Sequence, residues 1–394
     1  MKTVEITSGV HWVGVKDWDR KIFDALIPLP HGTSYNAYLV MGSEKTALID
    51  TVNPGFEGEL EDKINEIMDV ADIDYIVMNH AEPDHSGAIP YLLERNEKAV
   101  LVATKKGADI ARAYYDVPED RVMVVKDGDE VSLGGRTLRF IEAPWLHWPE
   151  TMFTYLVEDR ILFTCDFFGT HLARGFYDDG VPDILTHAQR YFGEIMMPFS
   201  AMARKALQKI GELEIEMIAP SHGPVYRNPR RIIEAYKGWS NGKTREKVLI
   251  AYVSMYGTNE GMIKELATRL TAEGIEVVVY NLVNLDIGEI AKDLVDSRAI
   301  VLAAPTVLGG AHPLAVYAAY LVKALRPPAE YAVLIGSHGW HGRSNDALLE
   351  VLGGVNLELL GTLDVHARPR RGDYNELLRL TNLLIKKVRG DEND

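Results

Sequence analysis

Residues 75–85, YIVMNHAEPDH, join a short apolar run to a dense group of potential metal ligands, His80, Glu82, Asp84 and His85. The apolar part, Tyr75–Asn79, is typical of a buried strand. Pro83 disfavours a regular strand or a helix interior, so we expect a loop in which alternate side chains converge on one point. A single histidine beside one acidic residue is usually structural, but four potential ligands within six residues predict a metal site.

Three further candidate ligands each follow an apolar run: His147 in APWLHWPE (143–150), Asp166 in LFTCDFFG (162–169) and His222 in IAPSHGP (218–224). Taken singly, each is more often a hydrogen-bonded polar residue. In sandwiches of mixed sheets the loops gather at one end, so side chains far apart in the sequence can meet there. Because several carboxylates accompany the imidazoles, the set favours iron over zinc.

The two halves of the chain have different patterns of strands. Up to about residue 240 short strands mix with a few helices, and we expect strands at 47–50, 75–79, 100–103, 137–142 and 161–165. From Lys247 strands and helices alternate, with a helix at 261–273 and strands at 248–253, 277–280, 299–303, 332–335 and 357–360. This alternation predicts a parallel sheet covered on both faces. The polar segment 238–245 separates the halves, so we predict domains at 1–245 and 246–394.

Three loops are expected at the carboxyl ends of the C-terminal strands, where doubly wound folds bind their ligands. The first lies between a strand and a helix and presents backbone N–H groups to a phosphate. It lacks the nucleoside-triphosphate motif GxxxxGK and the dinucleotide motif GxGxxG. The loops are expected at residues 254–260, 305–310 and 337–342, and together they resemble the FMN site of flavodoxin. The candidate FMN-binding residues are Ser254, Met255, Tyr256, Gly257, Thr258, Asn259, Pro305, Thr306, Val307, Leu308, Gly309, Ser337, Gly339, Trp340 and Gly342.

The complete ligand pattern resembles the metallo-beta-lactamase superfamily, whose first motif is HxHxDH. This chain departs from it at Glu82, and that departure is typical of the flavodiiron proteins. The resemblance covers the whole chain, from TSYNAYLV (33–40) to the flavin domain. It implies an α/β protein with an N-terminal metallo-beta-lactamase-like αββα sandwich and a C-terminal flavodoxin-like doubly wound parallel sheet.

The resemblance also implies roles for single residues. His80, Glu82 and His147 would bind one iron ion, Asp84 and His222 would bind the other, and Asp166 would bridge the two. His85 either completes the second iron or hydrogen-bonds a water ligand from outside the first shell. A substrate pocket would be lined by Trp148, Phe168, His171 and Tyr191, with His171 or Tyr191 offering a hydrogen bond or a proton.

The implied function is reduction of dioxygen to water, of nitric oxide to nitrous oxide, or of both. FMN stores two electrons and two ferrous ions supply two more, which together meet the four-electron demand of dioxygen. The electrons would come from an external donor, a rubredoxin-type protein or reduced coenzyme F420. A head-to-tail homodimer, alone or paired into a dimer of dimers, would bring the FMN of one subunit to the irons of the other.

Two other functions use the same residues. A zinc-dependent hydrolase would activate water with these ligands, but Glu82 and the fused flavin domain argue against it. A flavin electron carrier or sensor with a vestigial first domain would not need the complete ligand set.

Composition limits the possible partners and compartments. The net charge of −15 argues against binding of nucleic acid or of an anionic membrane surface. The sequence contains neither a secretory signal nor a run of about 20 apolar residues, so we expect a cytoplasmic protein. Cys165 is the single cysteine, which excludes an intrachain disulfide and a built-in rubredoxin-type iron centre. We expect Cys165 in the core, facing away from Asp166.

Overall fold

The computed structural model describes residues 2–284 and 286–390. Its contacts divide the chain into two compact units, Met1–Lys237 and Gly238–Asp394. The predicted domain boundary after residue 245 coincides with the first residue of a strand, β17. Part of the segment expected to be a linker is helical instead, because α7 (Pro229–Ser240) continues to Ser240.

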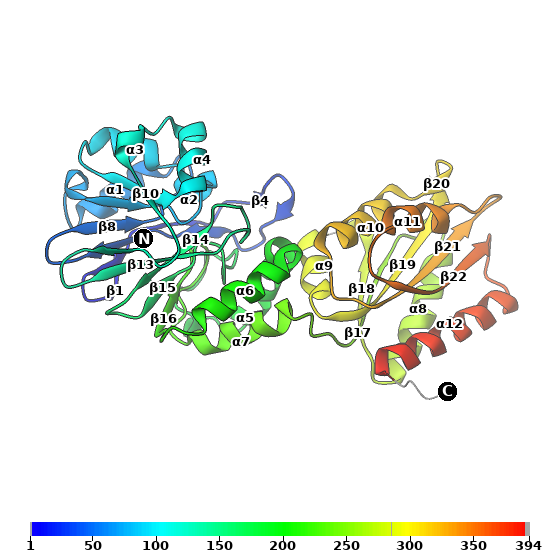
Figure 1. The fold of residues 1–394 in the computed structure, drawn as a ribbon. Helices are drawn as coiled ribbons and strands as arrows, with labels where there is room; N and C mark the ends of the chain where they lie inside the picture. The colour runs from blue at the N-terminus through cyan, green and yellow to red at the C-terminus, as the bar shows by residue number, and fades with distance from the viewer. Residues whose placement is uncertain (1, 285, 391–394) are drawn as a thin grey trace. The chain divides into compact units, whose positions relative to one another are not determined.

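Two sheets packed face to face form the centre of the first unit (Figure 1). The seven-stranded sheet has the order β1-β2-β7-β8-β9-β10-β11. Its strands are β1 (Val4–Thr7), β2 (Val10–Trp12), β7 (Tyr38–Met41), β8 (Thr46–Ile49), β9 (Tyr75–Val77), β10 (Val100–Thr104) and β11 (Val122–Val125). The five-stranded sheet runs β12 (Glu130–Ser132), β13 (Thr137–Glu142), β14 (Met152–Leu156), β15 (Ile161–Phe163), β16 (Met217–Ala219).

Helices cover the outer faces of both sheets. A second apolar core lies between the seven-stranded sheet and its helices, which are α1 (Glu57–Asn65), α3 (Ile89–Arg95) and α4 (Lys105–Tyr115). In Figure 1 the five-stranded sheet is flanked by α5 (Ile184–Tyr191), α6 (Ser200–Ile210) and α7. Two small hairpins complete the unit, β3 (Val15–Asp17) with β6 (Thr33–Tyr35) and β4 (Ile22–Phe23) with β5 (Ile27–Pro28). The predicted αββα sandwich is confirmed.

The second unit is built on a parallel sheet with the order β18-β17-β19-β21-β22. Its strands are β17 (Arg245–Tyr252), β18 (Glu276–Asn281), β19 (Ser297–Val307), β21 (Tyr331–His338) and β22 (Glu358–His366). This 2-1-3-4-5 order is the flavodoxin-like arrangement. The helices are α8 (Thr258–Ala272) and α12 (Arg371–Arg389) on one face, and α9 (Ile287–Leu294), α10 (Pro313–Leu325) and α11 (Ser344–Leu352) on the other.

Two of the predicted crevice loops are partly strand. β19 continues through Val307 because Thr306 and Val307 pair with the short antiparallel strand β20 (Gly310–Ala311). β21 continues to His338 because Ser337 and His338 pair with β22. The expectation of loops beginning at Pro305 and Ser337 is therefore wrong, although both segments remain at the carboxyl end of the sheet.

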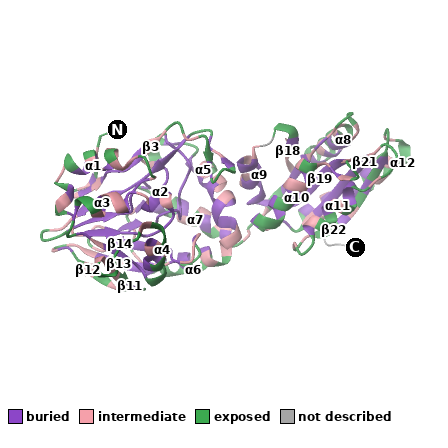
Figure 2. Cartoon of the chain, turned by 90° about the horizontal axis from the view of Figure 1, so that it is seen from above, coloured by how far each residue is buried: buried purple, intermediate pink, exposed green. Residues whose placement is uncertain are grey.

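Burial follows the layered architecture. Figure 2 shows buried residues concentrated in the strands and exposed residues on the outer turns of the helices. Cys165 is fully buried, which confirms the expectation that it belongs to the core. None of the helices in the described part of the chain combines the length and the apolar character needed to cross a bilayer.

Candidate functional site

The first ligand motif begins directly after β9 and ends in a one-turn helix, α2 (Pro83–Ser86). Asp84 and His85 therefore lie on a helix, and the expectation of a loop throughout this segment is wrong. Pro83 is compatible with the helix because it occupies the first helical turn, where a backbone N–H has no intrahelical partner. The turn points both side chains toward the same centre as His80.

The three later candidates reach the same place from the five-stranded sheet. His147 follows β13, Asp166 follows β15 and His222 follows β16. All seven candidate ligands gather at this end of the sandwich, and all except His147 are buried.

The two carboxylate oxygens of Asp166 face two different groups of side chains. Asp166 Oδ2 lies 3.2 Å from His80 Nε2 and 3.4 Å from His147 Nε2. Asp166 Oδ1 lies 3.0 Å from His85 Nε2 and 3.3 Å from His222 Nε2. Asp166 therefore stands between two half-sites.

Each half-site contains one further carboxylate. Glu82 Oε2 lies 3.2 Å from His80 Nε2 and 3.0 Å from His147 Nε2. On the other side, Asp84 Oδ2 is 3.2 Å from His222 Nε2, and Asp84 Oδ1 is 3.4 Å from His85 Nε2.

Several donor atoms of the cluster have no hydrogen-bond partner among the described residues. They are both carboxylate oxygens of Asp84, Oδ2 of Asp166, and Nε2 of His85 and His222. Leaving buried polar atoms unpaired is costly, and a bound cation would satisfy all of them. Donor atoms of His80, Glu82, His85 and Asp166 lie within 4.8 Å of one another, as do those of Asp84, His85 and His222. The residues therefore fit a pair of metal ions.

Outer hydrogen bonds orient two of the imidazoles. His80 Nδ1 lies 2.8 Å from Glu150 Oε1, and His222 Nδ1 lies 2.6 Å from the carbonyl oxygen of Ser34. An Nδ1–H that donates to these acceptors leaves Nε2 available to a metal. Burial acts to lower the pKa of His80, but hydrogen bonds with Glu150 and Glu82 outweigh it and raise that pKa well above its ordinary value. The carboxylates thus make the site strongly attractive to cations.

The predicted flavin loops of the second unit surround a cavity of about 380 Å³. Its lining includes twelve of the candidates, together with His338, His341 and Ala367. Gly257, Asn259 and Gly342 do not line it. Gly257 caps α8 with φ 82°, Asn259 Nδ2 donates to the carbonyl of Val253, and Gly342 has no room for a Cβ atom beside Asp364.

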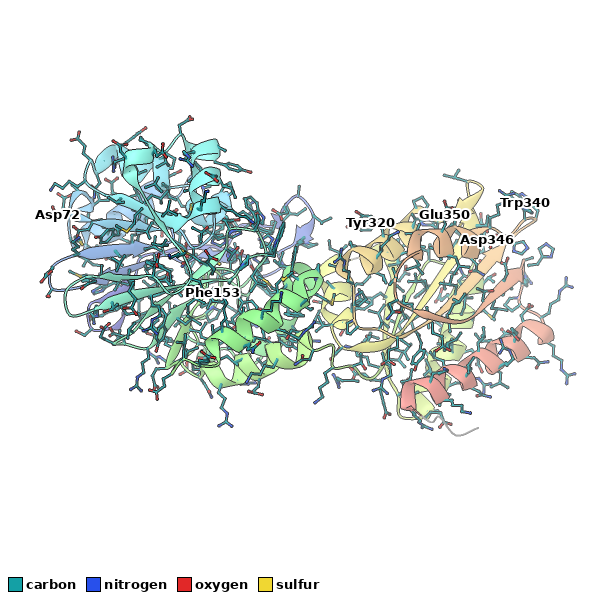
Figure 3. All side chains as sticks on the ribbon, viewed as in Figure 1. Asp72, Phe153, Tyr320, Trp340, Asp346 and Glu350 are labelled. Atoms are coloured by element: carbon teal, nitrogen blue, oxygen red, sulfur yellow. The ribbon has the colours of Figure 1, made fainter. Side chains whose placement is uncertain are left out.

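The cavity offers partners for the two ends of a flavin mononucleotide. Ser254 Oγ is buried beside the N-terminus of α8 and has no hydrogen-bond partner among the described residues, which fits a phosphate. Tyr256, Leu308 and Trp340 are each more than nine-tenths exposed on the rim, and Figure 3 shows Trp340 at the tip of the loop after β21. These apolar side chains are suited to a flat ring.

Comparisons with known proteins show the family to which the chain belongs. The family model described as "ODP family beta lactamase" matches residues 33–223. A nitric oxide reductase from Moorella thermoacetica is 39% identical over 91% of this chain and 91% of its own length. The structure of rubredoxin oxygen:oxidoreductase from Desulfovibrio gigas superposes with a TM-score of 0.95, at 30% identity over 99% of both chains. The flavodiiron protein from Giardia intestinalis superposes with a TM-score of 0.93, at 30% identity over 99% of this chain and 97% of that one.

This chain is a flavodiiron protein. It is an oxidoreductase whose cofactors are FMN and a non-haem diiron centre, as the resemblance implied.

The four residues expected to line a substrate pocket lie in different surroundings in this flavodiiron chain. The hydroxyl of Tyr191 donates to Asp166 Oδ1 at 2.8 Å, and burial raises the pKa of Tyr191 well above its ordinary value. His171 is buried, its Nδ1 lies 3.1 Å from Thr33 Oγ1, and its ring lies 4.8 Å from that of Tyr191. The ring of Trp148 stands edge-on to His80 at 5.2 Å. Phe168 packs within an aromatic cluster with Phe167 and Tyr236.

The hairpin β4–β5 also contributes to the flavodiiron site, although its sequence gave no signal. The Phe23 ring lies 4.8 Å from His171 and 6.2 Å from His222. Burial, and then the nearby carboxylates of Glu82, Asp84 and Asp166, raises the pKa of Asp24 at the turn. The motif IFDALIP (22–28) has no ligand spacing that could have pointed to this role.

A hydrogen-bond network beneath the flavodiiron site was not predicted from the sequence either. Asp50 accepts hydrogen bonds from the backbone and side chain of Asn79 at 2.8 and 3.1 Å and from Ser221 Oγ at 3.3 Å. Asn79 precedes His80 and Ser221 precedes His222, so Asp50 ties the two loops together. Burial raises the pKa of Asp50 to about 6.

Proposed function

We propose that this flavodiiron chain reduces dioxygen to water, nitric oxide to nitrous oxide, or both. The observation that carries the proposal is the two-sided environment of Asp166. Each of its carboxylate oxygens faces two histidines, and each pair of histidines lies beside one further carboxylate. Such a site can hold two metal ions that grip both ends of one small substrate. The relatives named for nitric oxide reduction and for dioxygen reduction match 91% and 99% of this chain, respectively.

The ligand assignment follows the two half-sites. His80, Glu82 and His147 would hold one iron beside Asp166 Oδ2, while Asp84, His85 and His222 would hold the other beside Oδ1. His85 is included because its Nε2 lies 3.0 Å from Asp166 Oδ1 and has no hydrogen-bond partner among the described residues. The carboxylates of Asp166, Glu82 and Asp84 would supply three negative charges against the four positive charges of two ferrous ions.

The protein's own contribution is to exclude water and to place hydrogen-bond donors. Bound iron and FMN would supply the electrons. The buried position of the ligands keeps bulk water away from the reacting molecule, and the Tyr191 hydroxyl holds a proton at Asp166 Oδ1. Ser254 and the N-terminus of α8 would hold the FMN phosphate, and the exposed rim would contact the ring.

We also propose a head-to-tail homodimer, alone or paired, with an external donor that is a rubredoxin-type protein or reduced coenzyme F420. Exposed apolar side chains occur beside both sites: Ile22, Leu26 and Trp145 beside the ligands, and Met255, Tyr256, Leu308 and Trp340 around the flavin cavity. Residues 1–237 contain 25 Lys and Arg against 38 Asp and Glu, whereas residues 238–394 contain 17 against 19. The nearly balanced flavin unit can therefore approach the acidic unit of a second copy.

The single buried cysteine supports a cytoplasmic location.

Mixing two inactive variants tests the dimer. Asp166→Asn disables the metal site, and Ser254→Glu places a carboxylate where the phosphate would bind. If each FMN serves the irons of the partner, subunit exchange recovers about a quarter of the wild-type activity, because half of the dimers are mixed and each has one intact pair of sites. No recovery after verified exchange would contradict the head-to-tail arrangement.

Rapid mixing tests the reaction itself. Enzyme loaded with iron and FMN is reduced without oxygen and mixed in a stopped-flow instrument with dioxygen or nitric oxide. We expect flavin oxidation within about a second with at least one gas. A holoenzyme that binds zinc in place of iron and reacts with neither gas would contradict the proposed function.

A further inference from the structure

A small cavity lies beside the metal site and is lined by residues 28–31, by His171 and by side chains of α5 and the turn after it. Its volume is about 10 Å³, close to the space needed by one water molecule. The polar part of its lining consists of three histidines, a tyrosine and an ion pair: His31, His171, His187, Tyr191, Arg190 and Glu194. A water needs two to four polar partners, and this lining supplies them.

The inner wall of the cavity adjoins the metal ligands. Tyr191 reaches Asp166 through its hydroxyl at 2.8 Å, and the ring of His171 lies 5.1 Å from that of His222. His171 Nδ1 is taken by Thr33, while its Nε2 is buried with no hydrogen-bond partner among the described residues. His171 is nine-tenths buried, so an unpaired Nε2 calls for a partner that the protein itself does not provide.

The outer wall leads to solvent through His187. This residue precedes Tyr191 by one turn of α5, which places the two side chains on the same face of the helix. The rings of His187 and His31 lie 5.0 Å apart. His187 Nε2 is 3.1 Å from Asp183 Oδ2 and 2.9 Å from Arg174, and the side chain of Asp183 is 51% exposed.

The proposed reaction requires a route by which protons reach the metal site. Each dioxygen reduced to two waters takes up four protons with its four electrons, and two nitric oxide molecules take up two protons to give nitrous oxide and one water. All of the ligands except His147 are buried, so these protons have to cross part of the protein to reach the cluster. The cavity places titratable side chains and room for a water between solvent and the cluster.

We propose that this cavity is the proton inlet of the site. A proton passes from solvent at Asp183 to His187, then to a water in the cavity, and from that water past the buried wall formed by His171 and Tyr191 to the molecule being reduced. Each imidazole or water accepts one proton and releases another, so the relay ends unchanged. The inference rests on the proposed function, because only a reaction that consumes protons needs the route.

Single-turnover kinetics of His187 variants test the inlet in the full-length protein loaded with iron and FMN. Pre-reduced His187→Gln should react with dioxygen or nitric oxide about tenfold more slowly than wild type, at the low end of general acid–base effects because water can partly replace the relay. The solvent isotope effect should increase, and added imidazole should restore the rate of His187→Ala. Iron and FMN content should stay unchanged.

His11→Gln is the matched control. His11 also lies beside an exposed carboxylate, that of Glu5, and its side chain is 17% exposed against 11% for His187. The control should react at the wild-type rate. Wild-type rates and isotope effects in both His187 variants would overturn the inlet, whereas a wild-type protein unreactive toward both gases would overturn the proposed function and with it the inlet.

A high-resolution crystal structure of the holoenzyme tests the proton inlet without any measurement of turnover. We expect an ordered water in the cavity within hydrogen-bond distance of His171 Nε2. A dry cavity would contradict the proposal even if the variants were slow.

Discussion

The two cofactor sites of this flavodiiron chain are built in opposite ways. The metal site consists of mostly buried side chains from separate loops and from the short helix α2, and several of its donor atoms are unpaired. The flavin site consists of strand ends and of loops with open rims, where Tyr256 and Trp340 are more than 90% exposed. Metal binding depends on the chemical identity of each ligand side chain. Binding of a flat ring and a phosphate depends more on the shape of the backbone around them. A single substitution should therefore weaken iron binding at the metal site much more than it weakens FMN binding at the flavin site.

The largest effect is expected from removal of the central charge. Asp166→Asn keeps the shape but removes the carboxylate that faces both half-sites. Iron affinity should fall by more than the ~100-fold typical of losing an outer-shell partner, and turnover should be abolished while FMN content is unchanged. Metal analysis checks this, with Asp109→Asn in an exposed pair on α4 as the control. Two irons retained by Asp166→Asn would disprove the bridging role.

A buried charge in the flavin unit should affect stability instead of cofactor content. Lys247 is buried and lies 2.6 Å from Asp293 and 2.8 Å from Asp296, so this cluster is paired, unlike the metal site. Lys247→Met should lower the free energy of unfolding by about 3 kcal/mol, because two carboxylates lose their buried partner. Denaturant unfolding measures the change in free energy, and the iron content of the variant should equal that of wild type. Lys264→Met at an exposed pair should change stability by less than about 1 kcal/mol.

The difference in unfolding free energy between wild type and Lys247→Met should change with pH in one direction. Burial acts to lower the pKa of Lys247, but hydrogen bonds with Asp293 and Asp296 outweigh it and raise the pKa above 10.5. A group with a raised pKa in the folded state gives its full stabilisation below the unfolded value. The gap between wild type and Lys247→Met should therefore be constant near neutral pH and shrink only above about pH 10.5. A gap that closes between pH 6 and 9 would contradict the assignment.

Removing the hydrogen-bond partner of a metal ligand should have an intermediate effect on iron binding. Glu150→Ala removes the acceptor of His80 Nδ1, and iron affinity should fall about 10- to 100-fold as the imidazole loses its orientation. Iron titration of the apoprotein measures the change. An unaltered affinity would show that the backbone alone orients His80.

The smallest effect is expected at the exposed rim of the flavin site. Trp340→Ala should weaken FMN binding by about 1 kcal/mol, roughly fivefold, through lost stacking. The unfolding free energy of the apoprotein should stay the same, because the indole is 93% exposed. FMN titration by fluorescence quenching measures the effect, with Tyr320→Ala, exposed on α10 and away from the cavity, as the control (Figure 3). A loss of stability in Trp340→Ala would contradict the account of an open site.

The same contrast explains what the sequence could predict. The ligand loop, His147, Asp166 and His222 could be found because each is a metal-binding residue type at the end of an apolar run. The parallel sheet of the second half followed from the alternation of strands and helices, whereas the sandwich of the first half was implied by the resemblance to the metallo-beta-lactamase superfamily. Glu150 and Asp50 act through hydrogen bonds to residues that are far away in the sequence, such as His80 at a separation of 70 residues and Asn79 at 29, and such contacts leave no local pattern. Phe23 reaches the site because a hairpin folds over it. Ala367 was missed although β22 neighbours β21, so the loop after it belongs to the same crevice.

The most direct measurement of the central claim is an electron balance for dioxygen. The holoenzyme is reduced anaerobically to four electrons per chain and mixed with a limiting amount of dioxygen. The account predicts about one dioxygen consumed per chain with no hydrogen peroxide released, because FMN and the diiron site together hold the four electrons needed to form two waters. Peroxide formed in proportion to the dioxygen consumed, or flavin oxidation that does not depend on bound iron, would contradict it.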